Sequence, residues 1–321
     1  MDCFGFSDSK ILCTDHSSFA FLYDTALRSV VPMPSLQSPK LCPISLSVPD
    51  QQNESGSVYV MEKVPRPRTE NCQFEAFVYA MPEYSYDKAW FRHSLPLPPY
   101  VLDPGYENTR IHSYTVLGGG SHLCVSAMGI GTYGFNTASR QWSQAGEWIL
   151  PFDGKAEYIP ELDLWFGLSD GDNLPCASDL SSVLNGVKPE LCHVWRNRYP
   201  PEWKSLGLTQ LASLGSGRFC ILDYFHTMLQ DTYDYGGQPV VDDTFAVISG
   251  VELLASGKSN GSGSGANGSC SYSGNGNGSG SRFNGSCRDN GSGNGKQGIR
   301  MIHHKSKIHK SDGYTMIQTM L

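Results

Sequence analysis

The feature that most constrains the fold of this chain is a recurring pair of apolar and aromatic runs separated by a turn. Within each run, apolar residues alternate with small or polar ones, which is the pattern of a β-strand with one buried face. A further run closes each of the first four pairs. The paired runs occupy residues 10–15 with 19–25, 57–64 with 73–81, 122–128 with 131–137, 164–169 with 174–180, and 218–225 with 244–253.

One more strand candidate precedes most pairs, at residues 43–48, 112–118, 156–162 and 208–215. Each unit therefore has three or four short strands, and successive units are spaced by about 45 to 70 residues. A single sheet of this size cannot bury both of its faces, so it needs a neighbour on each side. The pattern predicts an all-β fold, a kelch-like β-propeller of five or six blades.

The third unit shows the candidate structural motif of a blade, formed by Gly129, Gly131, Tyr133, Phe135 and Trp142. The two glycines suit a tight turn between the second and third strands. Tyr133 and Phe135 alternate with small or polar residues, so one face of the third strand is expected to pack against the adjoining blade. After a polar turn, Trp142 is expected on the outer strand. Glycines, Tyr-x-Phe, a turn and a tryptophan follow the order of a degenerate kelch repeat.

Trp90 and Trp195 are predicted to occupy outer-strand positions comparable to that of Trp142. Long collinear segments around these positions resemble a plant family, abundant in cereal grasses, that is catalogued only as a domain of unknown function and regarded as kelch-like. The segments are residues 73–82 (QFEAFVYAMP), 131–180, 214–227 (LGSGRFCILDYFHT), 245–253 (FAVISGVEL) and 301–309 (MIHHKSKIH).

The resemblance covers most of the chain from Asp2 to about Leu254, together with the tail. It implies a propeller fold but brings no catalytic or binding residues with it. Members of that family usually begin well upstream of the position corresponding to Met1. We therefore expect either an entire first blade or a propeller that is incomplete at its N-terminus.

The composition changes sharply near the C-terminal end, where a Gly/Ser/Asn-rich tract offers almost no apolar side chain to offset the entropy of ordering. We expect propeller blades over residues 1–255 and a disordered loop or linker over residues 256–298. Residues 299–310 are predicted to return as the final strand of the propeller, and residues 311–321 to form a flexible tail.

Charge and targeting signals limit the classes of partner. The formal net charge is −7, whereas a general nucleic-acid binder usually carries a basic excess, so no nucleic acid is expected. The sequence shows neither a secretory leader nor an apolar run of the roughly 18 residues needed to cross a membrane. None of the 10 cysteines forms a C-x-x-C pair, and most are expected to be reduced core residues. We expect an intracellular protein, cytoplasmic or nuclear.

Three motifs resemble chemical sites. Residues 129–134 (GIGTYG) match G-x-G-x-x-G, but no helix is predicted to follow, so a blade turn is favoured over a dinucleotide site. Asp170 and Asp172 in SDGDN have metal-ligand spacing, yet no terminal glutamate follows, which favours a hairpin turn. Residues 301–310 (MIHHKSKIHK) contain three histidines and favour a solvated, lysine-protected edge strand over a metal site or a phosphate-binding tail.

The sequence shows no nucleophile elbow, and its paired carboxylates are typical of solvated loops. We therefore expect no catalytic residues, metal or cofactor. The function predicted best is a non-catalytic module that binds protein partners, such as an adaptor or a substrate receptor. The alternative is an enzyme or glycan-binding propeller with a site at the mouth of the central channel. The alternative requires convergent ionisable groups with shifted pKa values in one pocket.

Overall fold

A computed structural model gives the arrangement of the chain. It describes residues 1–7, 9–49, 56–67, 72–82, 87–196, 199–233, 238–256 and 298–310. Most of the segment predicted to be a disordered linker (residues 257–297) and the whole predicted tail (residues 311–321) lie outside the described residues.

The described strands form consecutive four-stranded antiparallel meanders, which we number as units 1 to 5. Unit 1 consists of β1 (Asp2–Ser7), β2 (Lys10–Thr14), β3 (Ala20–Asp24) and β4 (Ser29–Met33). Unit 2 consists of β5 (Pro43–Val48), β6 (Ser57–Glu62), β7 (Phe74–Ala80) and β8 (Ala89–Ser94). Unit 3 consists of β9 (Ile111–Leu117), β10 (His122–Ala127), β11 (Gly131–Asn136) and β12 (Gln141–Gly146).

Units 4 and 5 complete the described sheets. Unit 4 contains β13 (Phe152–Ile159), β14 (Leu164–Ser169), β15 (Pro175–Ser178) and β16 (Leu191–Val194). Unit 5 contains β17 (Lys204–Ser213), β18 (Arg218–Tyr233), β19 (Pro239–Ala255) and β20 (Ile299–Lys310). Helical structure in the described ranges is limited to short 3₁₀ turns, at η1 (Pro99–Leu102), η2 (Gly118–Gly120) and η3 (Val183–Asn185).

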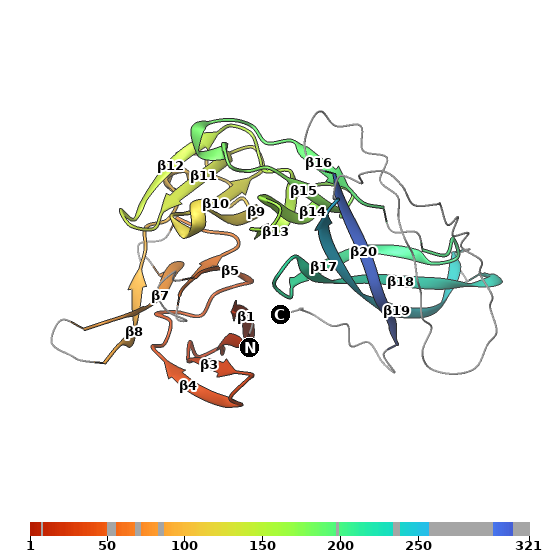
Figure 1. The fold of residues 1–321 in the computed structure, drawn as a ribbon, viewed down its shortest axis with the longest axis horizontal. Coiled ribbons are helices and arrows are strands. Elements are labelled where there is room, and N and C mark those ends of the chain that lie inside the picture. Colours follow the sequence, from red (N-terminus) through yellow and green to blue (C-terminus); the bar gives the residue numbers. More distant parts are fainter. Residues whose placement is uncertain are drawn as a thin grey trace, which may run out of the picture.

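The units follow one another around an arc, with their first strands on its inner side (Figure 1). Strand β1 contacts β5, β5 contacts β9, and β14 contacts β17. Between units 3 and 4, β9 and β13 pair in parallel, which joins the two meanders into one sheet. Four-stranded meanders with adjacent inner strands are the architecture of a β-propeller, and this part of the prediction is confirmed. The number of blades in the whole protein and the kelch type stay predictions.

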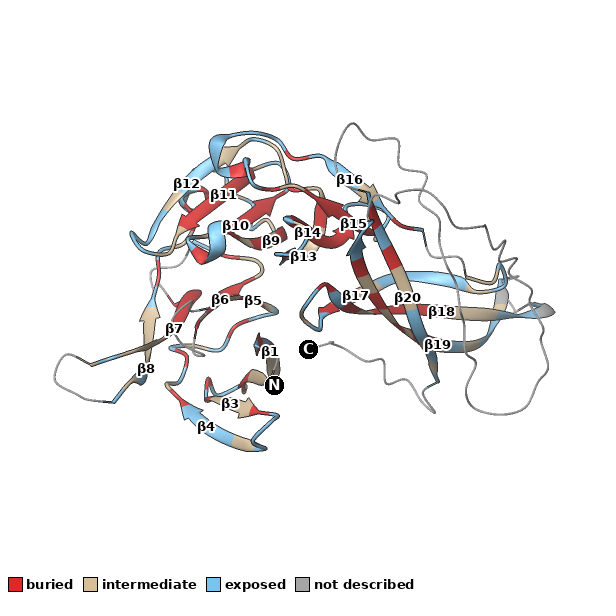
Figure 2. Ribbon diagram, in the orientation of Figure 1, coloured by how far each residue is buried: buried red, intermediate tan, exposed pale blue. Residues whose placement is uncertain are grey.

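Aromatic side chains fill the spaces between successive units. Between units 2 and 3, the ring centroids of Phe74 and Phe135 lie 5.1 Å apart in an edge-to-face arrangement. Between units 4 and 5, the rings of Phe166 and Phe219 lie 4.5 Å apart. Burial is strongest on strands β9, β10, β11, β14 and β15, whereas β4, β16 and much of β12 are exposed (Figure 2). Successive units thus bury the apolar faces that they turn toward each other, as the repeat pattern requires.

Three elements differ from the sequence prediction. Strand β1 was not predicted, but it pairs with β2 and gives unit 1 a fourth strand. Strands β18 and β19 have 16 and 17 residues, about twice the length of the apolar runs that predicted them. Trp195, predicted on an outer strand, lies just beyond the end of β16 and is buried, with its ring against Phe166. Its apolar ring packs between units 4 and 5, where burial stabilises it more than exposure on an edge would.

Candidate functional site

One side of the propeller gathers the segments that join consecutive units. In an antiparallel meander, the first and third strands begin on the side where the second and fourth strands end. Residues 34–42, 95–110 and 147–151 connect units on this side, together with the turns between second and third strands. We call this side the linker face. Polar contacts join neighbouring units along it.

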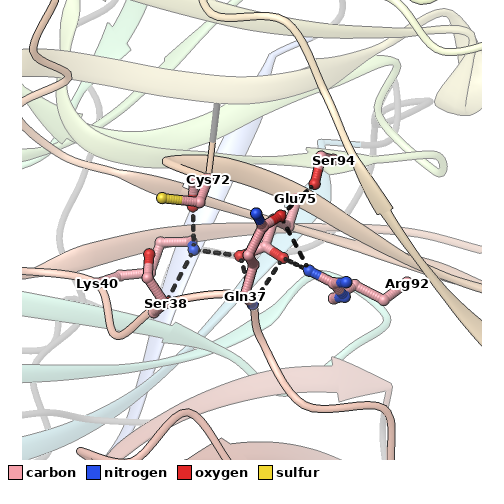
Figure 3. Close-up of polar contacts among 7 residues, drawn as sticks. All are labelled: Gln37, Ser38, Lys40, Cys72, Glu75, Arg92 and Ser94. Carbon is pink, nitrogen blue, oxygen red and sulfur yellow. Dashed lines mark hydrogen bonds and ion pairs between the residues drawn. The ribbon is translucent and has the colours of Figure 1, made fainter. Parts of the chain in front are cut away.

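The first of these contacts is a buried ionic cluster around Glu75, near the start of β7 (Figure 3). The Glu75 side chain is 0% exposed and accepts from the Lys40 ammonium, whose side chain is 1% exposed. Arg92 of β8 donates to the other carboxylate oxygen at 2.8 Å. The backbone N–H of Gln37 also donates to Glu75, at 3.0 Å. The cluster therefore fixes the linker between units 1 and 2 onto unit 2.

Lys40 has further partners that hold its charge in place. Its ammonium donates to the backbone carbonyl oxygens of Ser38, at 3.2 Å, and Cys72, at 2.5 Å. Because the side chains of Lys40 and Glu75 are buried among these protein groups, the cluster is not open to a ligand. Its role is structural: it shapes the linker face without forming a reactive centre.

A second cluster joins units 3 and 4 around His112, near the start of β9. Its Nε2 atom lies 2.9 Å from Oδ1 of Asp170, and its Nδ1 atom lies 3.7 Å from Oδ1 of Asp153. Asp153 lies near the start of β13, and Asp170 follows β14, so topology brings these residues together from three elements. The imidazole is buried and held between two carboxylates. Asp170 therefore acts in a polar contact between units, beyond its predicted place in a turn.

Two cations flank the second cluster. Arg110 Nη2 lies 3.4 Å from Oδ1 of Asp153, and the Arg110 side chain is 53% exposed. Lys63 directly follows β6, and its carbonyl oxygen accepts from the backbone N–H of Ile111 at 2.8 Å, which joins units 2 and 3. Burial lowers the pKa of Lys63, the charge of Arg110 lowers it further, and Asp153 opposes both effects.

The last contact of the series joins units 4 and 5. The side-chain amide of Asn173, in the turn between β14 and β15, donates to the carbonyl oxygen of Gly207 in β17 at 3.2 Å. The linker face thus carries a polar arc, which we define as Lys40, Glu75 and Arg92, then Lys63, Arg110, His112, Asp153 and Asp170, then Asn173. Within the arc, acids and bases face one another. Lys40, Glu75 and His112 are buried, whereas Arg110 and Asp170 bring charge to the surface.

The structure places the predicted blade motif on three elements of unit 3. Gly129, with φ 71°, lies in the turn between β10 and β11, and Gly131, with φ 111°, begins β11. Tyr133 and Phe135 of β11 are buried in the core shared with unit 2. Trp142 of β12 pairs with Phe135 across the sheet, and its indole N–H donates to the carbonyl oxygen of Pro96 at 2.8 Å. Whether this motif recurs as a kelch repeat stays a prediction.

The chemical look-alikes fall in turns and on an edge. GIGTYG spans the β10–β11 turn and is followed by strand, without a helix. Asp172 lies in the β14–β15 turn beside Gly171, whose φ is 91°. Strand β20 is the edge strand of unit 5, and there His304 Nε2 lies 3.0 Å from a carboxylate oxygen of Glu252.

In the described part of the chain, no three His, Cys, Asp or Glu side chains are arranged to hold a metal ion. Within the same residues, no helix is both long and apolar enough to span a membrane.

Sequence reasoning missed the polar arc. Its members are single charged or polar residues scattered between Lys40 and Asn173, and no spacing links them. The one signal that could have found them is positional, since most of them flank the ends of strand candidates on the side where units are joined.

Comparisons with known proteins return solved β-propellers among the similar structures. The β-propeller domain of Myceliophteria thermophila Cps50 (Swd1) matches at 9% identity and a TM-score of 0.39, covering 76% of this chain and 77% of that one. BamB from Moraxella catarrhalis matches at 13% identity and a TM-score of 0.28, with 76% and 78% covered. The C-terminal WD40 domain of Sif2 matches at 9% identity and a TM-score of 0.31, with 77% and 78% covered.

No curated protein matches the sequence significantly. A family model described as "Protein of unknown function (DUF1668)" matches residues 1–309, which is nearly the whole chain. The chain therefore belongs to this family, DUF1668.

Proposed function

We propose that this chain is a non-catalytic, protein-binding propeller, an adaptor or substrate-receptor-like module, that docks its partner on the linker face. The observation that carries the proposal is the polar arc: charged side chains from successive units meet on one side and pair with one another. In the proposal the protein acts inside the cell, in the cytoplasm or the nucleus.

The pairing within the arc favours binding over catalysis. A general acid or base needs a nitrogen or oxygen atom that faces its substrate. Both ring nitrogens of His112 face carboxylates, and Glu75 is fully buried against two cations. Such groups position a surface and resist rearrangement, which suits a rigid docking platform.

Exposed apolar residues on the same side add the second component of a protein interface. Leu41 lies on the linker between units 1 and 2, Leu102 on the linker between units 2 and 3, and Met128 in the β10–β11 turn. All three are exposed, and Leu102 is 74% exposed. Protein interfaces combine apolar anchors with a polar rim, and these loops carry both. We therefore expect a partner that presents an apolar side chain within a rim of mixed charge.

A pair of matched variants tests the proposal. Leu102→Asp changes an anchor on the linker face, whereas Leu27→Asp changes a leucine with nearly the same exposure, 76%, in the β3–β4 turn on the opposite side. Tagged wild-type protein and both variants are used to capture partners from plant tissue, the source suggested by the family resemblance, and the captured proteins are quantified by mass spectrometry. Arg110→Glu is tested in parallel.

We expect Leu102→Asp and Arg110→Glu each to reduce the captured amount of the specific partners at least 10-fold. A 10-fold reduction in affinity corresponds to about 1.4 kcal/mol of binding free energy. Leu27→Asp should retain them. Equal capture by all variants would contradict docking on the linker face, and turnover of a metabolite by the purified wild-type protein would contradict the non-catalytic role.

A further inference from the structure

Two cysteines of unit 1 face each other across the first pair of strands. Cys3 of β1 and Cys13 of β2 are directly opposite partners in the antiparallel register. Their Sγ atoms lie 3.4 Å apart, and both residues are free thiols. In the sequence they are two separate cysteines, ten residues apart. The register makes them a dithiol.

The backbone geometry of this pair already suits a covalent bond. Directly opposite residues of antiparallel strands have Cα atoms about 4.5 or 5.5 Å apart. Disulfides join residues whose Cα atoms are about 4.4 to 6.8 Å apart. Closing the distance between the sulfur atoms to the bonded value of about 2.05 Å therefore requires a side-chain rotation and no movement of the strands.

The two thiols differ in exposure, which sets the order of reaction. Phe4 and Phe6 of β1 are buried in the core shared with unit 2. Cys3 lies on β1, in the first unit of the propeller, and is partly exposed, whereas Cys13 is buried. Burial, together with the smaller effects of the hydrogen bond and charge of Cys3, raises the pKa of the Cys13 thiol to about 12. The accessible thiol is Cys3, and Cys13 is the buried resolving thiol.

We propose that Cys3 and Cys13 form a reversible disulfide by exchange with a small-molecule disulfide of the glutathione type. The Cys3 thiol loses its proton to solvent, and its sulfur attacks one sulfur of the small disulfide, which gives a mixed disulfide and releases one thiol. Cys13 then loses its proton, and its sulfur attacks Cys3 Sγ and expels the second thiol. The protein dithiol is oxidised, and the small disulfide is reduced to two thiols.

The bond would fasten the first strand of the propeller. Strand β1 lies at one end of the arc, where β2 is its pairing partner and Ser47 of β5 donates to the carbonyl oxygen of Gly5 at 2.9 Å. A covalent link to β2 closes a short loop in the unfolded chain and so stabilises the folded state. Oxidation therefore makes the end of the propeller more resistant to local opening.

Peptide mapping tests the proposal directly. Reduced, folded protein is incubated with oxidised glutathione, the remaining thiols are blocked by alkylation, and the protein is digested with trypsin without reduction. Trypsin cleaves after Lys10, between the two cysteines, so the disulfide would join the peptides 1–10 and 11–28. We expect this linked pair, its loss on addition of dithiothreitol, and a melting temperature about 5 °C higher in the oxidised protein.

Three variants provide the controls. Cys13→Ser should trap glutathione on Cys3, Cys3→Ser should show neither the linked peptides nor the rise in melting temperature, and Cys192→Ser, which removes an exposed thiol of β16, should behave as wild type. The proposal is overturned if wild-type protein carries glutathione on Cys42 and Cys192 while peptides 1–10 and 11–28 remain unlinked. The peptide map of the wild-type protein decides by itself whether the disulfide forms. Poor folding of a variant therefore does not affect the conclusion.

Discussion

Replacing Glu75 by glutamine should be among the most destabilising single changes in unit 2. The substitution keeps the size of the side chain but removes the anion that Lys40 and Arg92 share. The Lys40 side chain is 1% exposed, so its ammonium would keep neutral acceptors, the carbonyl oxygens of Ser38 and Cys72 and the new amide oxygen, but no opposing charge. Removing one partner of a buried ion pair costs about 3 to 5 kcal/mol.

We place the expected loss near the lower end, at about 3 kcal/mol, because the two carbonyl oxygens still solvate Lys40 and Arg92 can turn to solvent. Since whole domains are stable by about 5 to 15 kcal/mol, the loss is easily measured by urea unfolding followed by tryptophan fluorescence. A double-mutant cycle separates the energy of the Lys40–Glu75 interaction from the other effects of each substitution. It uses Lys40→Met, Glu75→Leu and the double variant.

The double variant should lose less than the sum of the two single variants, since Lys40 no longer remains as a buried charge without its anion. Solvent does not screen this interaction, because the Glu75 side chain is 0% exposed. A change below about 1 kcal/mol for Glu75→Gln, or strict additivity in the cycle, would refute the view that this cluster fixes the linker.

Three further predictions concern unit 3 and the edge of unit 5. Phe135→Ala removes a fully buried ring between units 2 and 3 and should cost about 3 to 5 kcal/mol in urea unfolding; a loss below about 1 kcal/mol would contradict its place in the core. Gly131→Ala should cost about 2 kcal/mol or more, because its Cβ would lie 2.3 Å from the carbonyl oxygen of Gly146 at a φ of 111°. Gly129→Ala, with open space at a φ of 71°, should cost only about 1 kcal/mol, and equal losses would contradict the packing argument. Burial lowers the pKa of His303 below its ordinary value, so the unfolded state binds its proton first as pH falls. Stability should therefore decline as pH falls through about 6.5, less so in His303→Gln, and parallel pH profiles of the two proteins would contradict this.

Much of the fold could be predicted because a strand with one buried face places apolar residues at every second position, and this alternation is visible in the sequence. The run at β10 and β11, with glycines at 129 and 131, indicated both strands and the turn between them. Strand β1 was not predicted because its alternation of apolar and small residues is limited to Phe4, Gly5 and Phe6, which is too short to stand out, although both phenylalanines are buried. Its place depends on pairing with β2 and packing on unit 2, which are tertiary effects.

The candidate site could not be predicted in the same way. His112 meets Asp153 and Asp170 only because β9 and β13 pair in parallel, and no local pattern predicts that pairing. Cys3 and Cys13 became a pair only through the register of β1 on β2. Contacts between residues distant in sequence are set by topology, whereas propensity and periodicity report on neighbours along the chain.

Hydrogen exchange of the free protein and of its complex with a captured partner tests the docking face most directly. Amide protection on binding should appear in residues 95–110, 147–151 and 170–174, which lie on the linker face. Residues 118–121, 137–140 and 160–163, the turns on the opposite side, should exchange equally fast in both states. Protection confined to those opposite turns would contradict the account.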